Sequence, residues 1–364
     1  MKVAFVHDWL NQYGGAEQVL SALHELYPEA PIYTSIFWPE AMPPEWKGWD
    51  IRPSWLDRLP FIKRHHQPFL PLYPLAFQGF NLSGYNLVIS NKSAFCHGVK
   101  AGRALHICYC LTPTRFLWNY EEYVKREGIS PLARAFLPFL VGWLRRWDRA
   151  AADRVDHFLA ISREVQSRIR EFYGRPSEVI YPPLDMEKFE VANGQDGYFL
   201  VLSRLIPYKR IDMAVEAFNQ LGLPLLVIGE GRDRERLQSM AEPNVEFLGW
   251  LPDGEVARYL ARCQALIFPG QEDFGLAPLE AIACGRPVIA YAGGGALETV
   301  VEGVTGAFFP QPTPQALAKT VKEFNGGHFD SATIRAHAER FSEERFQMEM
   351  KAFIEAKWAE HERR

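Results

Sequence analysis

Short apolar runs alternate with amphipathic stretches along most of the chain, a pattern typical of parallel sheets with helices on both faces. In the first half the runs predict strands at residues 2–7, 30–36, 86–90, 104–109, 157–161 and 178–181. In the second half they predict strands at 198–203, 224–229, 244–248, 264–268 and 287–291. Helices are predicted at 15–27, 162–173, 210–221, 232–241, 253–263 and 277–284. The sequence therefore predicts an α/β protein with doubly wound parallel sheets.

The pair Pro182-Pro183 marks a stiff link between the two halves, because proline continues neither a strand nor a helix. We expect a first domain at residues 1–182 and a second at 183–341. The length of 364 residues agrees with two domains. A last helix at about 342–360 carries an apolar stripe, which predicts that it packs on one of them.

Composition excludes some functions. A net charge of −4 argues against non-specific nucleic-acid binding, which needs a strongly basic surface. The five cysteines lack the spacing of a disulfide framework, so we expect a reducing compartment. The longest apolar run, residues 135–144, is shorter than the ~20 residues of a bilayer span. The apolar start before Asp8 is too short for a signal peptide, and we expect a cytoplasmic protein, soluble or peripheral to a membrane.

Two carboxylates, Glu272 and Glu280, flank a Phe-Gly-Leu turn directly after the apolar run 265–269. This pattern predicts a buried strand, a loop and a helix that starts near Ala277. Glycine lets the backbone approach a ligand closely, and the free N–H groups of a helix start attract anions. A sugar nucleotide requires such a combination of carboxylates for hydroxyls and amides for phosphate. A solvated helix start with two surface glutamates is the alternative.

Several motifs together resemble glycosyltransferase family 4, a large family of retaining enzymes with the GT-B fold. The resemblance rests on Glu-x7-Glu around Phe274-Gly275-Leu276, the basic pair Arg204 and Lys209, the glycines Gly14-Gly15 and the segment 181–185. It spans nearly all of the chain. Within the family, residues 109–115 look most like bacterial mannosyltransferases that build cell-surface polysaccharide.

The resemblance implies two Rossmann-like domains that face an interdomain cleft. Residues 1–182 would bind the acceptor, residues 183–341 would bind the nucleotide sugar, and the segment 342–364 would cross back to the first domain. The implied reaction is metal-independent hexose transfer with retention, with GDP-mannose as the preferred donor and a polysaccharide or lipid-linked glycan as acceptor. A UDP-sugar donor, a sugar-nucleotide epimerase on the same fold and a catalytically silent binding module stay open. No Gly-x-Gly-x-x-Gly follows the first strand, which argues against a dehydrogenase.

By resemblance, the catalytic residues are Arg204, Lys209 and Glu272. The two cations would neutralise the charge that grows on the leaving diphosphate, and Glu272 would bind hydroxyls of the donor sugar. Glu280 would accept the ribose hydroxyls, and the remaining donor contacts would come from Gly15, Leu248, Gly249, Phe274, Gly275 and Leu276. The sequence contains no Asp-x-Asp pair, so we expect neither a metal ion nor another cofactor.

One departure from the family pattern is Leu111, which stands where similar members carry a histidine. Leucine neither polarises an acceptor nor binds a sugar hydroxyl. Either acceptor binding differs, or a neighbour supplies the polar group, for which the candidates are His7, Asp8, His97 and Arg115, although His97 also suits a structural role. Glu298, after the triple glycine 293–295, is a further cleft candidate, although the glycines also suit a plain turn.

Two segments, residues 39–80 and 132–149, combine aromatic residues with cations; the second includes Arg134 and Phe136. This mixture suits a bilayer interface, where rings lie at headgroup depth and Lys and Arg meet anionic lipids. Helices packed in the first domain with solvated arginines would give the same composition. The expected partners are a nucleotide sugar, a glycan or lipid-linked acceptor and, as an open alternative, the inner face of the cytoplasmic membrane.

Overall fold

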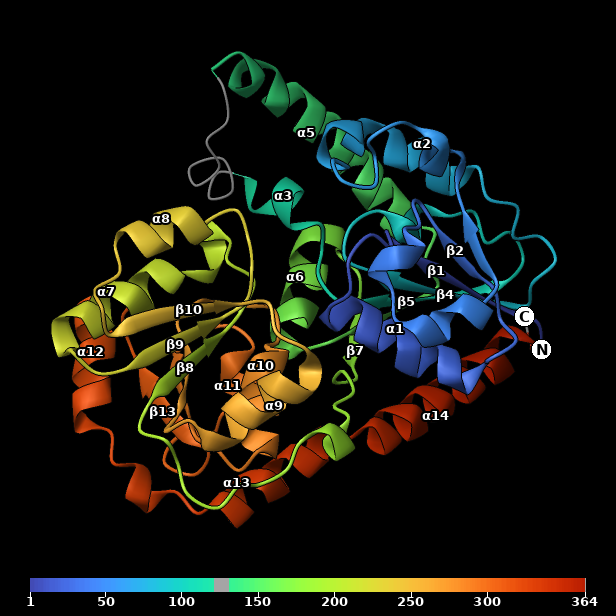
Figure 1. Cartoon of the computed structure of the whole chain (residues 1–364). Coiled ribbons are helices and arrows are strands. Elements are labelled where there is room, and N and C mark those ends of the chain that lie inside the picture. Colours follow the sequence, from blue (N-terminus) through green and yellow to red (C-terminus); the bar gives the residue numbers. More distant parts are fainter. Residues whose placement is uncertain (121–130, 364) are drawn as a thin grey trace. The chain divides into compact units, whose positions relative to one another are not determined.

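The computed structural model describes residues 1–120 and 131–363 of the chain. The chain forms two compact units, the first made of residues 1–183 and 344–364 and the second of residues 184–343. Each unit has a parallel sheet with helices around it (Figure 1). The prediction of doubly wound parallel sheets is therefore confirmed.

Among its described residues, the first unit has a seven-stranded sheet in the order β3-β2-β1-β4-β5-β6-β7. The strands are β1 Val3–His7, β2 Ile32–Thr34, β3 Ile51–Pro53, β4 Leu87–Lys92, β5 Leu105–Cys110, β6 His157–Ala160 and β7 Ser177–Val179. The helices are α1 Gly15–Leu26, α2 Tyr73–Gln78, α3 Arg115–Trp118, α5 Pro131–Ala152, α6 Arg163–Tyr173 and α14 Glu343–His361. Strands β1, β4 and β5 are buried along their whole length, because both faces of such a sheet are covered.

Residues 184–343, all of them described, contain a six-stranded sheet in the order β10-β9-β8-β11-β12-β13. The strands are β8 Phe199–Leu202, β9 Leu225–Ile228, β10 Val245–Gly249, β11 Leu266–Phe268, β12 Val288–Tyr291 and β13 Gly306–Phe309. The helices are α7 Ile211–Leu221, α8 Arg234–Ser239, α9 Asp253–Arg262, α10 Leu276–Ala283, α11 Ala296–Thr299, α12 Pro314–Glu323 and α13 Ser331–Ala338. Apolar residues of β8, β9, β11 and α7 form the core of this unit.

Every predicted strand overlaps an observed one, and the predicted ends of α6 are confirmed. Ser162 Oγ accepts the N–H of Val165 at 3.0 Å, and Gly174 ends the helix with a φ of 66°. The sequence pattern missed β3 and β13. Strand β3 is short and incompletely buried at the edge of its sheet, so its apolar signal is weak.

The strand order reverses between β1 and β4 in the first sheet and between β8 and β11 in the second. At such a reversal the connecting loops diverge to opposite sides and leave a crevice at the carboxyl ends of the strands, where α/β proteins bind ligands. The loops that follow these four strands are therefore expected to carry the ligand-binding residues.

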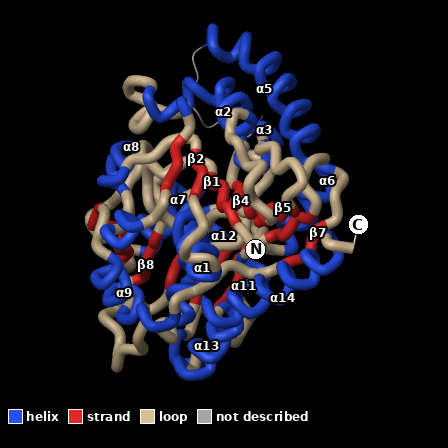
Figure 2. Tube along the Cα trace, turned by 90° about the vertical axis from the view of Figure 1, so that its right-hand side faces the viewer, coloured by secondary structure: helices blue, strands red, loops and turns tan. Residues whose placement is uncertain are grey.

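Helix α14 belongs to the first unit apart from its first residue. It runs beside α1 (Figures 1 and 2), where Gln347 Nε2 donates to Glu25 Oε2 at 2.8 Å. Phe346, Met350 and Ile354 are fully buried, so its apolar stripe completes the packing of this unit.

Candidate functional site

The carboxyl edge of the six-stranded sheet carries the strongest candidate site. At the reversal of strand order, the loops after β8 (residues 203–210) and after β11 (residues 269–275) follow neighbouring strands. An ion pair between Lys209 Nζ and Glu272 Oε2 joins the two loops. The side chains are 12% and 15% exposed, so both are sheltered from bulk water and still within reach of a ligand.

Lys209 lies before the following helix and is not part of it. It ends a 3₁₀ turn, Pro207–Lys209, and the next residue, Arg210, has a φ of 58°. Helix α7 begins only at Ile211, because a left-handed residue interrupts helical hydrogen bonding. Any electrostatic effect of Lys209 on a ligand would therefore come from its own charge and not from a helix N-terminus. Arg204, earlier on the same loop, is exposed, and its guanidinium has no ion pair or hydrogen bond with the described residues.

Two glycines let these loops meet. A Cβ at Gly270 would lie 2.7 Å from the carbonyl oxygen of Lys209, and a Cβ at Gly295 would lie 2.2 Å from Cα of Phe274. The N–H of Gly295 also donates to the carbonyl oxygen of Glu272 at 2.9 Å. The triple glycine after β12 therefore packs directly on the loop that carries Glu272, which gives these glycines a structural role.

Helix α10 starts at Leu276, after Gly275 with a φ of 95°. Its first turn leaves backbone N–H groups without helical acceptors, which is the arrangement that binds a phosphate or a hydroxyl oxygen. The ring of Phe274 is buried, with its centroid 5.9 Å from that of Phe341. Phe274 therefore anchors the loop with its side chain, and its buried ring is not placed to contact a ligand.

Glu280 lies one turn into α10 and is half-buried. Burial, and to a smaller extent the charge of Asp253, raises its pKa to about 7, and Lys188 opposes this increase. The carboxyl group therefore changes its charge near neutral pH.

The other predicted residues of the second unit lie at the same edge. Leu248 and Gly249 end β10, and Glu298 lies in α11, after β12. Because neighbouring strands are parallel, their carboxyl ends share one edge of the sheet with Lys209 and Glu272.

In the first unit, Asp8 is a structural carboxylate. It is fully buried and accepts the backbone N–H groups of residues 93–96 at 2.6–2.8 Å. These charge-assisted bonds tie the end of β1 to the loop after β4. Asp8 is therefore not placed to bind an acceptor in place of a histidine at position 111, because its oxygens are already occupied.

His7 and His97 are buried as well. His7 Nε2 lies 3.2 Å from Glu17 Oε1, and His97 Nε2 donates to the carbonyl oxygen of Asp148 at 3.2 Å. Burial, together with the charge of Lys92, lowers the pKa of His97 well below its usual range. His97 is thus a neutral packing residue, and neither histidine is placed to meet an acceptor.

Two candidates of the first unit are not buried. Gly15 is exposed at the start of α1, and Arg115 is half-buried at the start of α3. They follow β1 and β5, at the carboxyl edge of the seven-stranded sheet.

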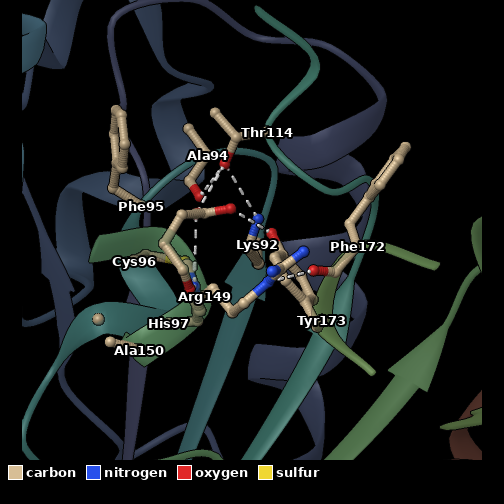
Figure 3. A network of polar contacts seen from close by, with 12 residues as sticks. Lys92, Ala94, Phe95, Cys96, His97, Thr114, Arg149, Ala150, Phe172 and Tyr173 are labelled. Atoms are coloured by element: carbon tan, nitrogen blue, oxygen red, sulfur yellow. Dashed lines mark hydrogen bonds and ion pairs between the residues drawn. The ribbon is translucent and has the colours of Figure 1, made fainter. Parts of the chain in front are cut away.

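A buried polar network escaped the sequence patterns (Figure 3). Lys92, the last residue of β4, is fully buried and donates through Nζ to Thr112 O and Thr114 Oγ1, each at 3.3 Å. Asp148, also fully buried, accepts the hydroxyl of Tyr173 at 2.7 Å. Burial is the largest single effect and opposes the charged form of Lys92, but Asp148 and other nearby groups together outweigh it, so the pKa is raised. The network fixes the turn after β5, and only the tertiary structure reveals it, because Asp148 lies among arginines in the sequence.

Comparison with protein families identifies the chain. The family described as glycosyl transferases group 1 matches residues 185–333, and the family described as glycosyltransferase family 4 matches residues 13–188. The chain belongs to glycosyltransferase family 4. The resemblance noted in the sequence is therefore confirmed, and this family 4 glycosyltransferase carries both halves of the family pattern.

Curated relatives of the glycosyltransferase are modestly similar. An uncharacterized glycosyltransferase of Methanocaldococcus jannaschii is 25% identical over 54% of this chain and 58% of that protein. The human alpha-1,3/1,6-mannosyltransferase ALG2 is 25% identical over 79% of this chain and 76% of that protein. A GDP-mannose-dependent phosphatidylinositol monomannoside mannosyltransferase of Mycolicibacterium smegmatis is 30% identical over 54% of this chain and 61% of that protein. The chain thus spans about three fifths of the archaeal and mycobacterial relatives.

Solved structures confirm the fold of the glycosyltransferase. The crystal structure of Anabaena HepE in complex with UDP has a TM-score of 0.74 at 18% identity, covering 98% of this chain and 100% of that one. At this identity the likeness concerns the fold alone. The GT-B fold expected from the sequence is confirmed.

Proposed function

We propose that this glycosyltransferase transfers mannose from GDP-mannose to a polysaccharide or lipid-linked glycan, with retention and without a metal ion. The observation that carries the proposal is the Lys209–Glu272 ion pair at the reversal of strand order in the second sheet. It presents a cation for a diphosphate and a carboxylate for sugar hydroxyls at one partly sheltered point.

The chemical step breaks the bond between the anomeric carbon and the phosphate oxygen and forms a bond to an acceptor hydroxyl. Negative charge grows on the leaving diphosphate, and in our proposal Lys209 and the exposed Arg204 neutralise it. For a front-face reaction the leaving phosphate itself takes the hydroxyl proton, so the protein contributes position and charge more than a general base. The N–H groups at the start of α10 would hold an oxygen of the donor.

The two glutamates take different parts of the donor in this proposal. Glu272 binds hydroxyls of the transferred sugar, and its ion pair with Lys209 holds it in position before the donor arrives. Glu280 accepts the ribose hydroxyls and does so best when ionised.

The mycobacterial relative, which is GDP-mannose-dependent by name, supports GDP-mannose as the donor. The HepE structure holds UDP, so a UDP-sugar is the alternative donor. Thermal-shift measurements with GDP, UDP and ADP sugars separate the two, since a ligand at 100 times its Kd stabilises a protein by about 2.7 kcal/mol. We expect GDP-mannose to raise Tm most. A larger shift with a UDP-sugar would assign the alternative donor, and no shift with any sugar nucleotide would contradict the proposed function.

For the acceptor we further propose that the first unit attaches to an anionic membrane surface. Phe61 is 79% exposed and Phe139 is 80% exposed. On α5, Phe139, Trp143 and Arg146 are exposed at positions i, i+4 and i+7, while Leu144 is buried. An exposed stripe of two aromatic rings and a cation suits a headgroup interface.

The cations of the two predicted segments are not equivalent. Lys63 is paired with Asp57 at 3.6 Å, and Arg145 donates to the carbonyl oxygen of Leu117 at 2.6 Å. Arg64 and Arg146 are exposed. Arg134 and Phe136 lie outside the side chains that the structure describes. None of the helices within residues 1–120 and 131–363 combines the length and hydropathy needed to cross a bilayer, so attachment would have to be peripheral.

The membrane proposal predicts that replacing Phe139, Trp143 and Arg146 with serine weakens binding to vesicles that contain phosphatidylglycerol by roughly 10-fold or more, because it removes two rings and one cation. Co-sedimentation at low salt measures this. The matched control is Met348→Ser, since Met348 is 68% exposed on α14. Equal binding by the triple variant and the control, or no binding by the wild type, would overturn membrane attachment through α5.

A further inference from the structure

The loop between β1 and α1 holds a second cluster of polar and aromatic side chains. Its middle residue, Leu10, is fully buried and held at both backbone groups: its N–H donates to Ile36 O at 2.9 Å, and its carbonyl oxygen accepts the N–H of Trp38 at 2.7 Å. Trp9 and Asn11, on either side of Leu10, therefore have fixed backbone positions. They follow the carboxyl end of β1, at the reversal of strand order in the first sheet.

Trp9 and Asn11 both contact His66. The rings of Trp9 and His66 are stacked, with centroids 4.9 Å apart and an interplanar angle of 22°. Asn11 Nδ2 donates to the carbonyl oxygen of Lys63 at 2.9 Å and lies 3.1 Å from His66 Nδ1. The three side chains thus form one cluster, and they come from two segments that lie far apart in the sequence.

These contacts fix the tautomer of His66. The carbonyl oxygen of Lys63 needs a donor, so the amide nitrogen of Asn11 faces it and the second N–H of the same nitrogen points to His66 Nδ1. Nδ1 is then an acceptor, and the proton of the ring is on Nε2. Burial lowers the pKa of His66 to about 4, so the ring is neutral at physiological pH.

Two hydrogen-bonding groups of the cluster are left over. Asn11 Oδ1 is buried and has no hydrogen-bond partner among the described residues. The N–H at His66 Nε2 likewise has none there. Buried polar atoms in folded proteins nearly always have a partner, so the Oδ1 atom of Asn11 calls for one, and the Nε2–H of the half-buried His66 offers a donor in the same cluster. A pyranose offers what is missing, because its hydroxyls both donate and accept and its C–H face packs on aromatic rings.

We propose that Trp9, Asn11 and His66 form a subsite for the acceptor sugar. This proposal rests on the proposed transferase function and names a glycan, and not only a lipid, as the group that the first unit recognises. It also explains how the protein binds an acceptor with Leu111 in place of the family histidine, since Asn11 and His66 supply the polar contacts to the acceptor. His7, Asp8 and His97 are buried and are not needed for this role.

The test compares His66→Phe with His66→Gln. Phenylalanine keeps a ring against Trp9 and removes both nitrogens, whereas glutamine keeps an acceptor for Asn11 and a donor for a sugar. The matched control is His65→Phe, because His65 is exposed and makes no hydrogen bond through its side chain with the described residues. The readout is GDP release from GDP-mannose, alone and with octyl glycosides of mannose, glucose, galactose and N-acetylglucosamine.

We expect at least one glycoside to accelerate GDP release by the wild type. His66→Phe should lower this acceleration by roughly 10-fold or more at the same glycoside concentration. The variant removes the donor to the sugar and leaves Asn11 Nδ2 without its partner Nδ1. His66→Gln should restore part of the acceleration, and the control His65→Phe should leave GDP release unchanged both with and without a glycoside. Full acceleration in His66→Phe, or none by any glycoside in the wild type, would overturn the subsite alone. A wild type that releases nucleoside diphosphate from no sugar nucleotide would overturn the proposed function and the subsite with it.

Discussion

Replacing Lys209 with methionine is expected to lower the rate of sugar transfer by about 10²- to 10³-fold, the usual effect of removing a group that stabilises developing charge. Lys209 is 12% exposed, so its charge acts with little screening by water. The variant would also break the ion pair with Glu272, which leaves that carboxylate without its partner. The measurement is the steady-state rate at saturating donor.

The matched control for this change is Lys319→Met, which removes the same charge from an α12 side chain that is 75% exposed. It should leave the rate within about twofold, because exposed charges in water interact weakly. Arg204→Ala should also lower the rate of sugar transfer, since we assign both cations to the same leaving group. A loss below about tenfold for both Lys209→Met and Arg204→Ala would contradict their assignment as charge-stabilising residues.

Glu272→Gln and Glu280→Gln are expected to change different kinetic constants, turnover in the first and the donor KM in the second. Glu272 is assigned to the transferred sugar, whose charge changes during the reaction, so its loss should lower turnover by roughly 10²-fold. Glu280 is assigned to the ribose, where the contact is the same in the ground state and the transition state. Glu280→Gln should therefore raise the donor KM and leave turnover nearly unchanged. Separate kcat and KM values for the two variants measure this asymmetry.

The pKa of Glu280 adds a second readout to the same experiment. Burial raises this pKa to about 7, so the carboxylate that we assign to the ribose hydroxyls forms only as the pH rises through that value. The donor KM of the wild type should therefore decrease as the pH is raised from about 6 to about 8. The donor KM of Glu280→Gln should not depend on pH in this range. If Glu280→Gln abolishes turnover while Glu272→Gln only raises the donor KM, the two roles are reversed.

The fold could be predicted where burial leaves a continuous apolar run. Strands β1 and β5 are buried at every position, so their sequences contain little else than apolar residues. Strand β13 was missed because it begins with Gly306, which reads as a turn residue. A Cβ there would lie 2.0 Å from the carbonyl oxygen of Val288, so the glycine is required by the close approach of β12 and not by a turn.

The candidate site was predictable to the same extent. Glu272 and Lys209 follow strands with clear apolar signals, and the order of strands then brings their loops together. The roles of Asp8 and Lys92 could not be predicted, because a charged residue at the end of a strand looks solvent-exposed in any sequence. Only the tertiary structure shows that residues 93–96 enclose Asp8 and that Lys92 lies beneath the turn after β5.

The most direct test of the account is GDP release from GDP-mannose, measured in the presence of EDTA for the wild type and for Lys209→Met. If the Lys209–Glu272 pair marks the donor site of a metal-independent glycosyltransferase, the wild type releases GDP at an undiminished rate in EDTA and Lys209→Met releases it at least about tenfold more slowly. Release that stops in EDTA, or that Lys209→Met catalyses as fast as the wild type, would contradict this account.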